Sequence, residues 1–439
     1  MGQGALDVSP PGRSALAFPR MVVMACFLAT FSFYVERTGF PVVFTQVAQE
    51  KNISETLKGT IFSAFYYGYA TSQIPASWIA FRVGGYKTLM LAFIGWSFFS
   101  IITPFAMHSV PLLLFARGAV GVSQGFVIPS VHSILAATMG PGDKSKAVSF
   151  VTSGMYLGSS TAFMVVPWLV KSFGTDISVE LLGLLGIFWL LLWLSMGHHV
   201  SECQYKASLS LKSGHMPGPN KDSIPWLKIL SHKAVWAILW NNFAFHYSLY
   251  VIMNWLPTYF ENVVRSKLTN LGWAKVMPYI CMFLAANVAG VLGERMVLKM
   301  NVDTKTTRAI INATGLGLAA MTLHFLMPCA NTKNMGVFAT TLTLALLGFS
   351  RGGWAVNHMD IAPEYAGVIM AISNTAGTVA GIIGVSFTGY LLENAGGARM
   401  IAGWQRAFTL AAAVNVCAIL IFSCYSQGQK VFTTARVAH

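Results

Sequence analysis

Three arginines stand inside long apolar stretches of this 439-residue chain: Arg37, Arg117 and Arg351. A charged side chain in hydrocarbon costs roughly 2.5 kcal/mol or more, so such residues normally face a polar cavity. A guanidinium group binds phosphate or carboxylate through two parallel N–H donors, and a low dielectric strengthens the attraction. Few acids accompany these arginines, although Glu36 directly precedes Arg37. The pattern predicts a cavity for a small anion. The alternative for each arginine is an interhelical ion pair or a position near the membrane surface.

Four further residues are candidates for substrate binding, coupling or gating. Histidine changes its charge near neutral pH, which suits a proton-sensitive gate, so His246 and His358 are candidates for that role. His246 also counts among the substrate-binding candidates, and its alternative is a hydrogen-bonded packing residue. Asp360 is expected to clamp one end of its helix, with a coupling role as the alternative. Tyr67 is expected to line the cavity, with aromatic packing at one end of the span as its alternative.

The elements that must hold these residues are membrane-spanning helices. Hydrophobic residues make up 55% of the chain and charged residues 10%, against about 25% charged in ordinary globular proteins. Lipid offers backbone groups no partners, so spans are helices or closed barrels, and the alternating ten-residue segments of a barrel are absent. Since a span needs roughly 20 apolar residues, the sequence predicts an all-α polytopic membrane protein with twelve transmembrane helices. The expected spans are 21–47, 57–79, 88–107, 111–137, 147–172, 179–197, 234–260, 270–294, 308–328, 334–357, 362–392 and 403–425.

The expected spans fall into two sets of six, separated by the only long polar stretch, residues 198–233. Two consecutive six-helix halves are typical of transporters built from parallel repeats, which are pseudo-symmetric. The sequence therefore predicts five parts, which are an N-terminal tail (1–20), a first bundle (21–197), a central loop (198–233), a second bundle (234–425) and a C-terminal tail (426–439).

The distribution of Lys and Arg predicts that both tails and the central loop are cytoplasmic. With that orientation the cytoplasmic side carries seventeen of these residues and the other side nine, in agreement with the positive-inside rule. Asn52-Ile53-Ser54 then becomes a glycosylation acceptor on the outer or lumenal side. Residues 1–19 contain few Arg or Ser and do not resemble a transit peptide, so we expect an endomembrane (Golgi or vesicle) or the plasma membrane.

The sequence lacks the residues that several other classes of protein need. The net charge of +14 is spread over short polar gaps with no basic face or aromatic platform, so nucleic-acid binding is not expected. No P-loop and no HExxH motif occurs, and the six cysteines form no CxxC pair. We therefore expect no enzyme activity, no metal site and no cofactor, with Na⁺ or H⁺ as a possible coupling ion. A polytopic membrane enzyme and a transporter-like receptor stay as alternatives from other classes.

A loop motif recurs at the same place in both halves. The chain reads Arg82-Val-Gly-Gly-Tyr-Lys87 after the second span and Gly290-Val-Leu-Gly-Glu294-Arg295 after the eighth. The repeat resembles the Gly-x-x-x-Asp-Arg-x-Gly loop of the major facilitator superfamily. In that family the acid and the arginine clamp the cytoplasmic gate, so the resemblance implies gating roles for Arg82, Glu294 and Arg295. The first copy has Phe81 where Asp is usual.

A second set of motifs is similar to the anion:cation symporter branch of that superfamily. These are Asn357-His-Met-Asp-Ile-Ala-Pro-Glu-Tyr-Ala-Gly367, Phe65-Tyr-Tyr-Gly-Tyr-Ala-Thr-Ser-Gln-Ile-Pro75 and Trp255-Leu-Pro-Thr-Tyr-Phe260. The branch includes sodium/phosphate cotransporters, sialin, and vesicular nucleotide and glutamate transporters, and the chain looks most like plant type-4 phosphate transporters.

The resemblance implies that Arg37 contacts the substrate and that Arg117 is linked to coupling. Gln124 stands where vesicular members carry a proton-linked Glu, and Phe245 stands at the second substrate arginine of the glutamate carriers. The resemblance therefore implies secondary transport of a small anion by a monomer, with phosphate first, nucleotides second and organic acids third. A sodium, proton or membrane-potential gradient would drive it.

Overall fold

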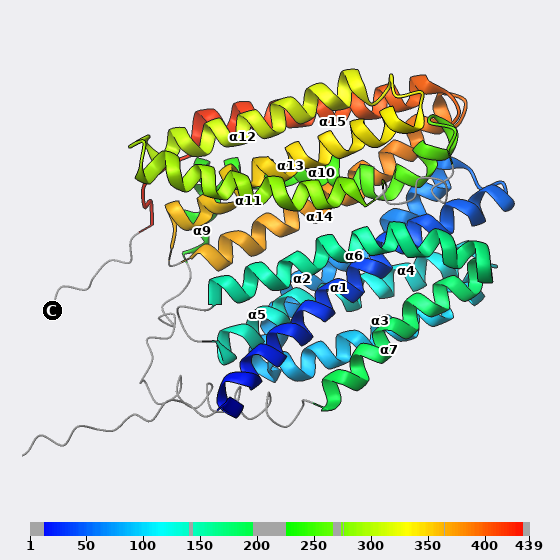
Figure 1. Cartoon of the computed structure of the whole chain (residues 1–439), viewed down its shortest axis with the longest axis horizontal. Helices are drawn as coiled ribbons and strands as arrows, with labels where there is room; N and C mark the ends of the chain where they lie inside the picture. The colour runs from blue at the N-terminus through cyan, green and yellow to red at the C-terminus, as the bar shows by residue number, and fades with distance from the viewer. Residues whose placement is uncertain are drawn as a thin grey trace, which may run out of the picture.

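The computed structural model describes residues 13–139, 144–195, 225–266, 274, 276–363 and 365–432. Within these ranges all the regular structure is helical. We call the end of the molecule at which α1 begins and α15 ends the terminal end, and the other end the opposite end. The helices run alternately between these two ends (Figure 1).

Helices α1 to α7 build the first bundle. α4 and α5 form one rod that is interrupted at Phe126. The bounds are α1 (Arg13–Glu50), α2 (Glu55–Val83), α3 (Gly85–Ala106), α4 (Val110–Gly125), α5 (Val127–Thr138), α6 (Lys144–Phe173) and α7 (Thr175–Ser195).

Helices α10 to α15 build the second bundle, and the π-helical turn η2 continues α12 in one rod. The bounds are α9 (Trp226–Ser231), α10 (Lys233–Asn262), α11 (Met277–Leu298), α12 (Thr304–Met321), η2 (Thr322–Leu326), α13 (Lys333–Ile361), α14 (Ala366–Asn394) and α15 (Ile401–Tyr425). The described residues thus form twelve long rods, and the predicted fold class is confirmed.

Nine of the described rods are long and apolar enough to cross a membrane by length and composition alone. The remaining three, α2, α6 and α10, are richer in polar residues. α10 explains how such a rod is tolerated, because most of its residues are buried by other helices. A helix enclosed by protein does not need a continuous apolar surface, since it does not face lipid.

Several helices pack inside their own bundle and also take part in the contact between the two bundles. In the first bundle α1 packs on α6, α2 on α4 and α3 on α7, while in the second α13 packs on α11 and α12. Gly154 and Gly158 bring α6 against the backbone of α1, where a Cβ atom would collide with Phe27 and Phe31. Small residues at such crossings permit close packing of helices. The bundles meet through α2 with α14, α1 with α10 and α6 with α11 (Figure 1).

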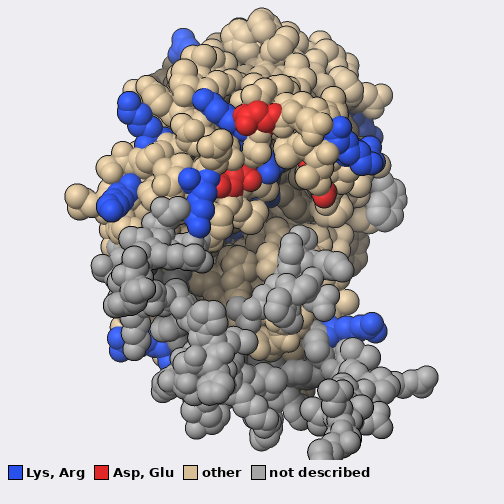
Figure 2. Space-filling view, turned by 90° about the vertical axis from the view of Figure 1, so that its left-hand side faces the viewer, with Lys and Arg blue, Asp and Glu red and all other residues tan. Residues whose placement is uncertain are grey.

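The bundles are joined in the half of the molecule toward the opposite end and separated toward the terminal end. Figure 2 looks onto the terminal end and shows a hollow among its described residues, with basic side chains around it. Toward the opposite end, the hydrogen bonds that join the bundles include Gln49 Nε2 to Glu261 Oε2 (2.7 Å), Thr56 N to Glu393 Oε2 (2.8 Å), Ser386 Oγ to Ser63 Oγ (2.6 Å) and Asn254 Nδ2 to Tyr66 Oη (2.8 Å). The molecule is therefore closed at the opposite end and open at the terminal end.

The predicted tails and central loop lie partly outside the described residues, which omit 1–12, 196–224 and 433–439. The loop prediction for 198–233 needs one correction, because residues 226–231 form helix α9. Residues 426–432 pack on the second bundle, where Phe432 is buried and the Val431 amide donates to the Ile361 carbonyl (2.8 Å).

Candidate anion-binding site

A central cavity of about 180 Å³ lies between the two bundles. It extends from Tyr279 on α11 to Val148 and Ile238, which lie near the terminal ends of α6 and α10. The described residues that line it include one arginine, Arg351, and no Asp or Glu. Its electrostatic character is therefore positive, as the sequence predicted for an anion cavity.

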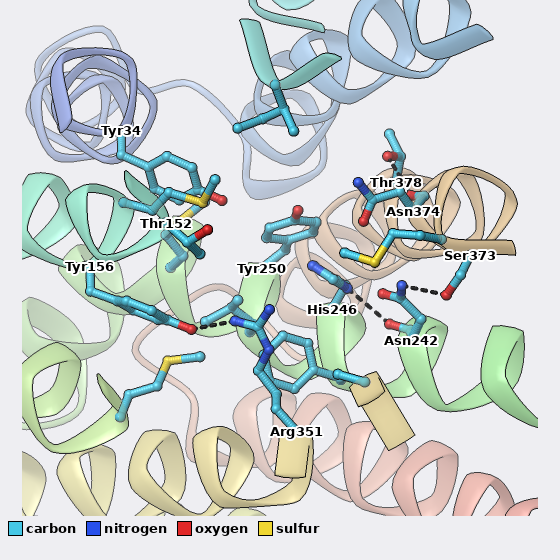
Figure 3. A pocket seen from close by; sticks show the side chains of 18 of the residues that line it. Tyr34, Thr152, Tyr156, Asn242, His246, Tyr250, Arg351, Ser373, Asn374 and Thr378 are labelled. Atoms are coloured by element: carbon cyan, nitrogen blue, oxygen red, sulfur yellow. Dashed lines mark hydrogen bonds between the residues drawn. The ribbon is translucent and has the colours of Figure 1, made fainter. Parts of the chain in front are cut away.

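Arg351 projects from α13 into this cavity and reaches across to the first bundle. Its Nη1 atom donates a hydrogen bond to the hydroxyl of Tyr156 on α6 (Figure 3). Its guanidinium carbon lies 5.5 Å from the centre of the Phe245 ring. No carboxylate among the described residues pairs with it. Its charge is therefore available to a solute in the cavity.

Arg37 lies directly behind the cavity wall rather than in it. Its side chain is 3% exposed, and its guanidinium carbon lies 4.8 to 5.4 Å from the centres of five aromatic rings. Three of those rings, from Tyr34, Tyr69 and Tyr250, also line the cavity. The Nε and Nη2 atoms have no hydrogen-bond partner, and no described carboxylate forms a salt bridge with them. Arg37 thus holds a buried and unbalanced positive charge one ring away from the cavity.

Arg117 forms an ion pair with Glu36, which was the alternative expected for it from the sequence. Its Nη1 atom donates to Glu36 Oε1 (2.6 Å), and Gln124 Nε2 donates to Glu36 Oε2 (2.7 Å). All three side chains are buried, and Arg117 also lies 3.7 Å from the centre of the Phe40 ring. Arg117 is not among the residues that line the cavity. Its charge is therefore balanced inside the first bundle, and its predicted contact with the substrate is absent from this structure.

His246 lines the cavity next to a short polar chain on α10 and α14. Its Nδ1 atom lies 3.0 Å from the carbonyl oxygen of Asn242, and Asn242 Nδ2 donates to Ser373 Oγ (2.6 Å) (Figure 3). Because a carbonyl only accepts, Nδ1 carries the hydrogen, and Figure 3 shows the other ring nitrogen turned away from Asn242. His358 also lines the cavity, near the terminal end.

The prediction that Tyr67 lines the cavity is wrong. Its side chain is 57% exposed and does not line the cavity. Successive residues of a helix point about 100° apart, so the inward face of α2 belongs to its neighbours. Tyr69 lines the cavity, and the Tyr66 hydroxyl accepts a hydrogen bond from Asn254 Nδ2 at the bundle interface.

The predicted gating residues lie at the terminal end, but they do not meet one another. Arg82 is exposed and its guanidinium carbon lies 4.8 Å from the centre of the Trp78 ring. Glu294 and Arg295 are exposed at the end of α11, and neither forms a salt bridge with another described residue. Asn52 is exposed in the turn between α1 and α2, at the opposite end.

Asp360 clamps the terminal ends of α12 and α13, through a partner that the sequence had not singled out. Arg308 holds both carboxylate oxygens, with Nε to Oδ2 at 2.8 Å and Nη2 to Oδ1 at 3.2 Å. Arg308 Nη1 also donates to the Gly352 carbonyl (3.3 Å). Arg308 is the first residue of an expected span, where a basic residue is also consistent with a charge at the membrane surface. Only the tertiary structure therefore reveals that Arg308 pairs with Asp360.

The Major Facilitator Superfamily matches residues 26–385 of the sequence. The chain belongs to that family. A solved bacterial homologue of the human lysosomal transporter Spinster has the same fold, with a TM-score of 0.71 and 16% identity, covering 95% of this chain and 97% of that one. The superfamily, expected from the repeated loop motif, and the twelve-helix architecture, expected from the apolar stretches, are both confirmed.

The curated relatives agree with the anion:cation symporter branch. "Probable anion transporter 6" of Oryza sativa subsp. japonica is 38% identical, covering 95% of this chain and all of that protein. "Ascorbate transporter, chloroplastic" and "Sodium-dependent phosphate transport protein 1, chloroplastic", both of Arabidopsis thaliana, are 31% and 30% identical over 94% of this chain. The matched regions make up 76% and 80% of the lengths of these two proteins. The chain is a multi-pass membrane protein of a transporter family.

Proposed function

We propose that this chain is a secondary active transporter of small anions, with inorganic phosphate as the leading candidate substrate. The observation that carries the proposal is the charge around the central cavity. Arg351 lies in the cavity and Arg37 one ring behind it, and the described lining contains no carboxylate. An unbalanced charge is expensive to bury. An anion would lower that cost, so the cavity is suited to negative solutes.

The size of the cavity favours a compact anion. Its volume is about 180 Å³. Pockets for drug-sized ligands occupy about 300–1,000 Å³. Phosphate fits this space, and a nucleotide would require a wider state. An organic anion the size of ascorbate is the second candidate, because one relative is named for it.

Alternating access would move the anion between the two ends of the molecule. Hydrogen bonds close the opposite end in this structure, and breaking them while the terminal end closes would expose the cavity to the other side. Arg351 and Tyr156 come from different bundles and already meet across the cavity. Arg351, Arg37 and His246 would bind the anion, while Arg117 would act indirectly through Glu36.

We propose that an electrochemical gradient drives the transport of the anion. Sodium, protons or the membrane potential are the three candidates, and Glu36, Gln124, His358 and Asp360 are the residues that we assign to coupling or gating. Among the described residues no cluster of three or more His, Cys, Asp or Glu side chains could hold a metal ion. We propose that the carrier works as a monomer in an endomembrane or the plasma membrane, with cytoplasmic termini and no cofactor or nucleic-acid partner.

The experiment that tests this function is uptake by purified protein in liposomes. Labelled phosphate, ATP, glutamate and ascorbate are compared under sodium, proton and voltage gradients that are imposed one at a time. We expect uptake of phosphate that Arg351→Gln abolishes, with Arg399→Gln, an exposed arginine at the opposite end, as the matched control. Failure of every anion to enter would refute transport and favour a membrane enzyme or a receptor.

A further inference from the structure

A second pocket, of about 630 Å³, opens on the side of the molecule between α2, α9, α10 and α14. Its lining is apolar except for Gln73 and Thr375. Three indole rings dominate it, from Trp226, Trp236 and Trp240, and each of them is 42 to 50% exposed. We call it the lateral groove. Neither the central cavity nor the proposed transport function accounts for it.

The lateral groove has the depth of one membrane leaflet. Along α10 it runs from Trp236 to Phe243, and Lys233 continues the same face at the terminal end. Residues 233, 236, 240 and 243 follow the spacing that places side chains on one side of a helix. The ten steps from Lys233 to Phe243, at 1.5 Å each, rise about 15 Å, which is half of the roughly 30 Å hydrocarbon core.

The order of residues along this face matches the order of groups in a phospholipid. Lys228 is exposed on α9 two residues after Trp226, and Lys233 is exposed at the start of α10, where its Nζ atom lies 5.4 Å from the centre of the Tyr425 ring. Both lie beyond the lining of the groove, at its terminal end. The tryptophans follow at the depth where indole rings sit between headgroups and acyl chains. Phe243 and the apolar face of α14 come last. The geometry points to a binding site for an anionic phospholipid, with its phosphate at Lys228 and Lys233 and an acyl chain in the groove.

A lipid in the lateral groove would contact α10 and α14 on the faces that point away from the central cavity. On α14, Ser373 and Thr378 face the cavity, while Ala376 and Val379 line the groove. On α10, Asn242 faces the cavity while Trp240 lines the groove. Gln73 adds a contact from the first bundle. A lipid that contacts both bundles would stabilise the arrangement of the bundles in this structure, which is open at the terminal end.

Lipid binding to the full-length chain tests this assignment without relying on transport. Delipidated protein is titrated with phosphatidylglycerol or with phosphatidylcholine of identical acyl chains, and bound lipid is counted by native mass spectrometry. We expect phosphatidylglycerol to bind more tightly. Each lysine near an anionic headgroup contributes about 1 kcal/mol, so Lys228→Gln with Lys233→Gln should weaken its binding by about 30-fold at 1.4 kcal/mol per tenfold. Lys87→Gln with Lys299→Gln removes the same charge from exposed positions at the same end, outside the groove, and should have no effect.

The acyl-chain part is tested separately with Trp240→Ala against Trp168→Ala, an exposed tryptophan on α6 outside the groove. Trp240→Ala should weaken the binding of both lipids, and Trp168→Ala should weaken the binding of neither. Equal binding of the two lipids to the unmodified protein would overturn the assignment, as would equal losses in the lysine pair and its control. Because the readout is binding, a protein that transports no anion could still confirm the lipid site, and a transporter could still lack it.

Discussion

Replacing Arg37 by Gln removes a charge that no described carboxylate balances. The guanidinium carbon lies 4.9 Å from the centre of the Tyr69 ring, and an anion in contact with the other face would add roughly 3.5 Å, about 8 Å in all. At an effective dielectric of about 20, two unit charges at that distance attract by about 2 kcal/mol, or about 30-fold in affinity. Arg351 lines the cavity, so an anion could contact its guanidinium group at about 4 Å. At the same dielectric the two charges then attract by about 4 kcal/mol, or close to a thousandfold in affinity.

The measurement is the KM for phosphate uptake into liposomes, with thermal unfolding measured on the same preparations. Arg37→Gln should raise KM by about 30-fold, Arg351→Gln should raise it more, and Arg37→Lys should keep most of the affinity. The unfolding temperature of Arg37→Gln should change little, because the substitution removes a buried charge that no carboxylate balances together with its contacts to five aromatic rings. An unchanged KM in Arg37→Gln would refute the reasoning, and a large loss of stability would show that Arg37 is structural.

Three other substitutions test the remaining parts of the structure. Glu36→Leu leaves Arg117 unpaired and should cost roughly 3–5 kcal/mol of unfolding free energy, which the double variant with Arg117→Met should largely restore; no restoration would contradict the isolated ion pair. Ser63→Ala removes the hydrogen bond that Ser386 donates and the one that Ser63 donates to the Ile382 carbonyl, each worth about 0.5–1.5 kcal/mol. A cysteine label at the opposite end should therefore react about 5- to 150-fold faster, and an unchanged rate would show that these bonds do not hold this end closed. Asn52→Gln should abolish a glycan-dependent gel shift in eukaryotic cells, and a shift that persists would place glycosylation elsewhere.

The fold could be predicted because the bilayer leaves few solutions. Apolar stretches of the required length must become helices in lipid, and the polar stretch between the sixth and seventh spans separates the halves. Composition alone would still have missed α2, α6 and α10, which do not meet the apolar criterion. The expected boundaries place them correctly because each lies between clear polar gaps. Helix α9 was missed, since six residues beside a proline carry too little periodicity to distinguish a helix from a loop.

The site was only partly predictable, because pairing is a tertiary property. Glu36 and Arg37 are adjacent in sequence, yet the carboxylate turns to Arg117 and Gln124 while Arg37 turns to the tyrosines. Side chains of neighbouring residues on a helix do not face each other, so adjacency could have suggested this outcome. Nothing local could have identified Tyr250, which lies more than two hundred residues away in sequence from Arg37.

The two charges on α1 therefore respond differently to alternating access, and this leads to a last prediction. Glu36 is held by partners within its own bundle, so its surroundings persist when the bundles rock. Arg37 is enclosed partly by Tyr250 of the other bundle, so its surroundings change. An empty carrier must pass through the closed state with its guanidinium charge unbalanced, whereas a loaded carrier is neutralised by the anion. Liposomes preloaded with unlabelled phosphate should therefore take up labelled phosphate faster than empty ones, and equal rates would mean that Arg37 is no barrier to the empty carrier.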